Sequence, residues 1–88
     1  MSKKRKKNVK RKQKTVTLDT LPAGSEATVD RLTSKCNMKD RLTSLGFCRG
    51  EKIVCVMESP LGDPTAYLIR GTLVALRRSD ARGVAVLL

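Results

Sequence analysis

The chain has 88 residues and a formal net charge of +11, and it contains no histidine, no tryptophan and three cysteines. This length predicts a single domain. Because histidine is absent and the eight carboxylates are scattered singly, no common pair of nucleophile and base can be assembled, and we expect no enzyme and no required cofactor.

Three further features concern the location of the protein. No apolar stretch reaches the roughly 20 residues that span a bilayer. No apolar segment follows the basic start as it would in a secretory signal. The number of cysteines is odd, which disfavours a disulfide framework. We therefore expect a cytoplasmic protein.

The positive charge is concentrated in residues 1–14, which contain nine cations and no carboxylate. Without them the remaining ten Lys and Arg face eight carboxylates, so the formal charge falls from +11 to +2 over residues 15–88. Such a leader has too few apolar side chains to offset its ordering entropy. We predict a disordered basic tail over residues 1–14, followed by one folded domain over residues 15–88. The cations of the tail are Lys3, Lys4, Arg5, Lys6, Lys7, Lys10, Arg11, Lys12 and Lys14.

Short apolar runs separated by Pro and Gly predict five or six strands in the domain. Pro22 and Gly24 favour a turn after the first run, and Gly71 favours a tight turn between two later runs. The predicted strands cover residues 15–18, 27–32, 53–57, 66–69, 73–76 and 84–88.

Residues 37–46 depart from the period of two residues that is typical of strands. Met38, Leu42 and Leu45 are spaced to lie on one face of a helix. Asn37 suits the N-cap of this helix, and Gly46 suits the left-handed position after its end. The sequence thus predicts an all-β domain with a short inserted helix. An SH3-like small β-barrel fits this pattern, although periodicity alone does not separate it from an OB-like barrel.

The segment that joins the third and fourth predicted strands contains two prolines, and Gly62 lies between them. We expect a stiff, exposed loop with Leu61 at its tip and with Asp63 extended before Pro64. One interpretation is a simple strand connection, and the other is a loop that docks on a partner.

The cysteine spacing does not predict a tight metal site, because no pair is close enough to form a C-x-x-C knuckle. Cys55 lies in the middle of an apolar run and is expected to be buried. Cys36 and Cys48 stand beside cations, and we expect them to be exposed and available for weak coordination.

In their order and spacing, four segments resemble the FeoA family, the ferrous iron transport protein A domain. The resemblance covers residues 15–88 and rests mainly on an R-L-x-x-L-G-F block together with P-L-G-D-P. Arg49 departs from the family pattern, in which proline is frequent before the second glycine of the block. The matching segments are residues 18–24, 41–50, 59–64 and 70–77.

The resemblance implies an SH3-like barrel that binds the cytosolic GTP-binding region of the membrane ferrous iron transporter FeoB and modulates it. The signature falls on the helix and on the proline-bounded loop. The basic tail itself has two interpretations: it could contact an anionic membrane surface, which would make the protein cytoplasmic and peripheral to the inner membrane, or it could be a solubilising or nucleic-acid-binding leader. The expected partner-binding residues are Arg41, Leu42, Leu45, Gly46, Pro60, Leu61, Gly62, Asp63 and Pro64.

Two alternatives from other classes remain open. The basic run could contact nucleic-acid phosphates, but the domain offers only Phe47 and Tyr67 for stacking on bases, so we do not expect the folded domain to bind nucleic acid. A regulator that responds to weakly bound transition metal, such as Fe²⁺, could use Cys48 or Asp63. The sequence does not locate such ligands.

Overall fold

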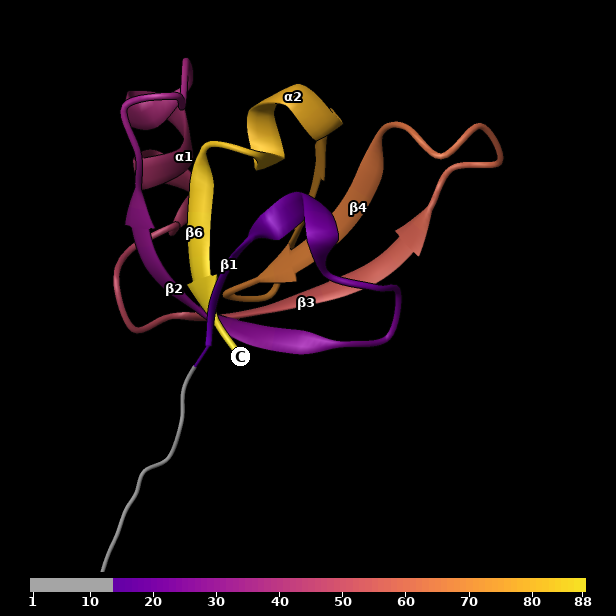
Figure 1. Cartoon of the computed structure of the whole chain (residues 1–88), viewed down its shortest axis with the longest axis horizontal. Coiled ribbons are helices and arrows are strands. Elements are labelled where there is room, and N and C mark those ends of the chain that lie inside the picture. Colours follow the sequence, from indigo (N-terminus) through magenta and orange to yellow (C-terminus); the bar gives the residue numbers. More distant parts are fainter. Residues whose placement is uncertain (1–13) are drawn as a thin grey trace, which may run out of the picture.

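A computed structural model describes residues 14–88 of the chain (Figure 1). It confirms the prediction of a β domain with an inserted helix, and each predicted strand is present. Apart from Lys14, the predicted basic tail lies outside the described residues. The elements are β1 (Thr15–Thr17), the 3-10 helix η2 (Leu18–Thr20), β2 (Glu26–Leu32), α1 (Lys39–Leu45), β3 (Lys52–Glu58), β4 (Thr65–Ile69), β5 (Thr72–Leu76), α2 (Arg78–Ala81) and β6 (Val84–Leu87).

The six strands form one antiparallel sheet in the order β1-β6-β2-β3-β4-β5. The last strand, β6, lies between β1 and β2, and it brings the two ends of the domain together. Register shifts between Val29 and Arg31, and between Cys55 and Met57, are bulges that bend the sheet. The curled sheet has the form of a small barrel (Figure 1), but its hydrogen-bonded order within residues 14–88 remains open at β1 and β5.

The core lies on the concave face of this sheet and is lined by alternate residues of the strands. Ile53 and Cys55 of β3 and Tyr67 and Ile69 of β4 are almost fully buried. This alternation is what a period of two residues predicts for a sheet that is covered on one face.

The inserted helix, α1, is present where the sequence predicts it, but its start differs. Met38 occupies the N-cap position without a side-chain capping bond, so the prediction that Asn37 caps the helix is wrong. Gly46 follows the helix in the left-handed conformation, as predicted. Leu42 is 0% exposed, and Met38 and Leu45 pack against the core, which confirms that these three residues share a buried face.

The turn between β4 and β5 is a two-residue hairpin loop. Arg70 and Gly71 both have positive φ, at 51° and 78°. This is the signature of a type I′ turn, whose twist matches that of the flanking strands. The predicted hairpin is therefore confirmed.

The short helix α2 was not predicted. Its residue Ala81 is 0% exposed, and Gly83 follows close to the backbone of the loop between β2 and α1. A Cβ atom at Gly83 would lie 2.5 Å from the Cα atom of Cys36. This close approach buries Cys36, so the expectation that Cys36 is exposed is wrong.

Candidate docking surface

The loop between β3 and β4 presents an apolar side chain to solvent. Leu61, at its tip, is 93% exposed, which is the highest value among the large hydrophobic side chains of residues 14–88. Hydrogen bonds from the Gly62 N–H to the Ser59 C=O, at 2.8 Å, and from the Ser59 N–H to the Pro64 C=O, at 3.2 Å, close the loop on itself. The predicted exposed loop with Leu61 at its tip is confirmed.

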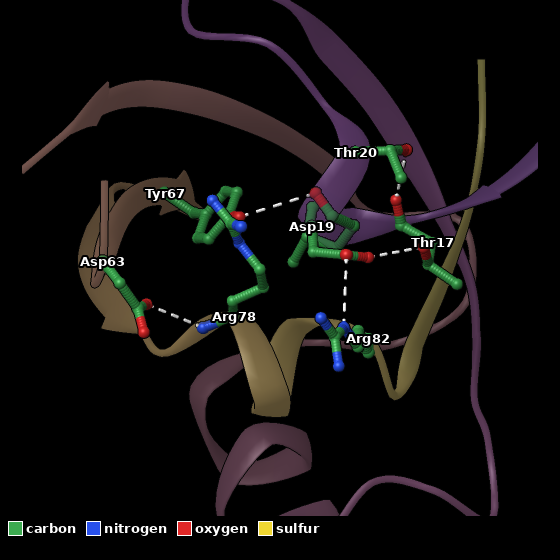
Figure 2. A network of polar contacts seen from close by, with 8 residues as sticks. Thr17, Asp19, Thr20, Asp63, Tyr67, Arg78 and Arg82 are labelled. Atoms are coloured by element: carbon green, nitrogen blue, oxygen red, sulfur yellow. Dashed lines mark hydrogen bonds and ion pairs between the residues drawn. The ribbon is translucent and has the colours of Figure 1, made fainter. Parts of the chain in front are cut away.

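Asp63 fixes this loop to the rest of the domain. Its Oδ1 atom accepts a hydrogen bond of 2.8 Å from the backbone N–H of Arg78, the first residue of α2 (Figure 2). The first N–H groups of a helix have no partner within the helix, and a carboxylate at this end also interacts favourably with the helix dipole. Asp63 thus caps a helix that begins 15 residues later in the chain.

A second carboxylate, Asp19, lies near the other end of α2 (Figure 2). It accepts a hydrogen bond from the Thr17 hydroxyl, and its Oδ2 atom lies 3.7 Å from Nε of Arg82. The Thr20 hydroxyl donates to the Thr17 C=O at 2.7 Å. Together these contacts hold η2 against α2, the helix to which Asp63 fixes the loop.

In the view of Figure 2, Tyr67 lies between Asp63 and Asp19, and its hydroxyl donates a long hydrogen bond of 3.5 Å to the C=O of Leu18. Burial, and to a smaller extent the nearby Cys55, raises the pKa of Tyr67 to about 12. Burial also raises the pKa of the Cys55 thiol, with Glu58 as the smaller cause. Both side chains are therefore neutral at physiological pH, as suits core residues.

On α1, the structure divides the predicted partner-binding residues into two groups. Arg41 is exposed, whereas Leu42 is in the core and cannot contact a partner directly in this structure. Gly46 is buried against the Arg70 side chain, whose Cδ atom would lie 2.6 Å from a Cβ at this position. Leu42 and Gly46 thus position the helix. Of the predicted binding residues on α1, Arg41 is exposed and Leu45 is half-buried.

The helix and the loop do not form one compact patch. In the view of Figure 1, α1 and the loop between β3 and β4 lie at opposite ends of the molecule. The strand β5 connects the two regions, because it starts after the Arg70 turn that contacts Gly46 and ends just before Arg78, the partner of Asp63. A partner that contacts both regions would have to extend along β5.

The described cysteines are all free. Cys55 is buried as predicted, and Cys48 is exposed as predicted. Within residues 14–88, no group of three or more Cys, Asp or Glu side chains is placed to hold a metal ion. In this same part of the chain, no helix is long and apolar enough to cross a membrane.

Sequence reasoning missed the supporting residues Asp19, Arg78 and Arg82. Their contacts join segments that are far apart in the chain, so no local pattern indicates them. One signal was present, however: Arg77 to Asp80 follow a strand directly, and Asp80 lies within a first helical turn, where acidic residues are favoured.

These features define a class of protein: a small SH3-like β-barrel with an exposed loop that Asp63 fixes to α2. The model of the FeoA domain matches residues 16–87. The chain therefore belongs to the FeoA family, whose members are associated with ferrous iron transport.

Relatives agree with this assignment. A fusion protein of Fe²⁺ transport protein A and the Fe²⁺ transporter FeoB from Porphyromonas gingivalis is 35% identical over 69 residues, which is 78% of this chain. The chain spans only 8% of the length of that relative.

Solved structures show the same fold. The FeoA protein of Chlorobium tepidum has a TM-score of 0.74 and 35% identity, with coverage of 81% of this chain and 68% of that one. The zinc complex of Stenotrophomonas maltophilia FeoA, described as a prokaryotic SH3 domain protein, has a TM-score of 0.72 and 33% identity, with coverage of 81% and 88%. A manganese-dependent transcriptional repressor shares the fold alone, at 17% identity and a TM-score of 0.74.

Proposed function

We propose that this protein is an accessory factor of ferrous iron uptake that binds the cytosolic GTP-binding region of a FeoB-type transporter and modulates it without chemistry of its own. The observation that carries the proposal is the fused relative, in which a FeoA part and a FeoB part share one polypeptide. Fusion keeps two modules at high effective concentration, which is useful when they act on each other.

The structure supports a binding role for the loop at residues 59–64. Because Asp63 fixes the loop, its backbone loses little conformational entropy when a partner covers Leu61, which is 93% exposed. Such an apolar anchor is typical of the few residues that contribute most of the binding energy at an interface. Arg41 on α1 offers a charge at the other end of the molecule.

Binding alone does not explain modulation. A bound protein shifts a conformational equilibrium only if its affinity differs between the two states. We therefore expect the affinity of this chain for the transporter region to change between its nucleotide-free and GTP-bound forms.

A binding experiment with the full chain tests the proposal. Immobilised transporter region is expected to retain the wild-type chain, and Leu61→Asp and Arg41→Glu are each expected to weaken retention by about tenfold or more, the loss typical of a central interface residue. Leu88→Asp, at another exposed leucine, and Lys35→Glu, at another exposed cation, are the matched controls. Wild-type retention of both loop and helix variants would count against this docking surface, and no retention of the wild-type chain would reject the proposal.

A further inference from the structure

The edge strand β5 offers backbone groups that have no partner in the described part of the chain. It pairs with β4 through a two-residue loop, so Ile69 and Thr72 form a hydrogen-bonded pair and the pairs then alternate. Thr72, Val74 and Leu76 therefore bond to β4. The N–H and C=O groups of Leu73 and Ala75 point to the open edge, where residues 14–88 supply no backbone partner.

This edge lacks the features that usually protect a sheet edge from pairing with other chains. Folded proteins shorten their edge strands, interrupt them with bulges or proline, or place charges on them. The opposite edge, β1, has only three residues. By contrast, β5 has five residues, a register without shifts against β4, and the sequence TLVAL, in which no residue is charged.

A groove runs beside this strand. It lies between β5 and α1, has a volume of about 330 Å³, and is lined by Met38, Arg41 and Leu45 of the helix region and by the whole of β5. Side chains alternate along a strand, so every second residue of an added strand would face this groove. The other residues would lie beside Leu73, which is 63% exposed on the outer face of the sheet.

The positive charge around the edge of β5 favours an acidic binding partner. Arg41 lines the groove, and Arg70 and Arg77 flank the two ends of β5. All three are exposed, and none forms an ion pair with a carboxylate of residues 14–88. Residues 64–79 contain three arginines and no carboxylate. The basic leader of this chain would place cations next to these arginines, and so would a second copy paired through β5. Repulsion between like charges therefore disfavours both as the occupant of this edge.

We propose that the open edge of β5 and its groove bind an extended acidic segment of a partner protein, which joins the sheet as an additional strand. Strand addition of this kind takes affinity from backbone hydrogen bonds and specificity from alternate side chains. The inference rests on the proposed function, because the partner it addresses is the transporter region. It extends that function in two respects: β5 is the element that binds the partner, and the bound segment of the partner is acidic.

Hydrogen exchange of the full chain, followed residue by residue, tests this geometry. In the free chain, the amides of Leu73 and Ala75 are expected to exchange rapidly, while that of Val74 is protected by its bond to Tyr67. Addition of the transporter region is expected to slow Leu73 and Ala75 by about tenfold, the effect of one new hydrogen bond each. Unchanged exchange in a complex that does form would overturn the inference and leave the proposed function standing.

Two variants separate the backbone contribution from the charge. Ala75→Pro removes an outward N–H and no bond to β4, a substitution that edge strands tolerate, and it is expected to lower affinity by about tenfold relative to Ala75→Ser. If the proline variant does not fold, Arg41→Glu against Lys35→Glu provides the second comparison. Equal affinity within each pair would overturn the inference.

A peptide probe makes the test independent of the transporter. An acetylated hexapeptide of alternating Glu and Val is expected to slow exchange at Leu73 and Ala75, and the corresponding peptide of Lys and Val is expected to have no effect. Equal effects of both peptides would contradict the acidic preference. Protection that grows with the concentration of the chain alone, together with a dimer in sedimentation, would identify a second copy as the occupant and also overturn the proposal.

Discussion

Replacement of Asp63 by alanine removes the contact that fixes the exposed loop to α2. The lost bond is the 2.8 Å contact from the Arg78 N–H to Oδ1. Because the N–H of Arg78 is at the first position of α2, the chain has no helical carbonyl to offer it in exchange. The substitution should therefore weaken both the loop and the start of the helix.

The expected cost follows from measured helix caps. Loss of a capping side chain destabilises proteins by ~0.5–2 kcal/mol, and because Asp63 is exposed we expect ~1 kcal/mol here. For a domain of this size, that loss lowers the Tm by about 4–8 °C. Asp63→Asn keeps an acceptor oxygen and loses only the charge, so it should cost about half as much.

Urea denaturation of wild type, Asp63→Ala and Asp63→Asn measures these differences, and exchange of the Arg78 amide reports the bond itself. Glu58→Ala is the control, because this nearby exposed carboxylate forms no hydrogen bond or ion pair with residues 14–88. A wild-type Tm for Asp63→Ala, with an Arg78 amide as protected as before, would refute the bracing role of Asp63.

Three further predictions concern the core. Gly83→Ala should destabilise the domain by ~2–3 kcal/mol, because the new Cβ would lie 2.5 Å from the Cα atom of Cys36. Chemical denaturation measures this loss, and a wild-type stability would contradict the close packing of Gly83 on Cys36. Stability should fall by about 2 kcal/mol between pH 10 and pH 12, because Tyr67 ionises near 10 when unfolded and near 12 when folded. Thermal unfolding of Tyr67→Phe should lack this component, and an unchanged profile would contradict it. A thiol reagent should modify Cys48 quickly in the native chain and the buried Cys36 and Cys55 only on unfolding, whereas rapid reaction of all three would contradict the burial.

Much of the fold could be predicted because its signals are local. Short apolar runs between Pro and Gly located the strands, the spacing of Met38, Leu42 and Leu45 located α1, and Gly71 located the hairpin turn. Each of these patterns depends on residues within a few positions of one another. The position of β6 between β1 and β2 could not be read in this way, since it depends on pairing across the whole chain.

The candidate site was predicted less completely for the same reason. Leu61 was correctly placed at an exposed tip, because the prolines around it are neighbours in sequence. The contact of Asp63 with Arg78 spans 15 residues, and the burial of Cys36 depends on Gly83, so neither has a local signature. The sequence also grouped α1 with the loop, whereas the fold places β5 between them.

The most direct test of the account is a titration of the labelled full chain with the cytosolic GTP-binding region of its FeoB-type transporter, followed by NMR. We predict saturable shifts at Leu61, Arg41 and the residues of β5, with little change at β1, the opposite edge of the sheet. The absence of any saturable shift, or shifts confined to β1 and β6, would contradict it.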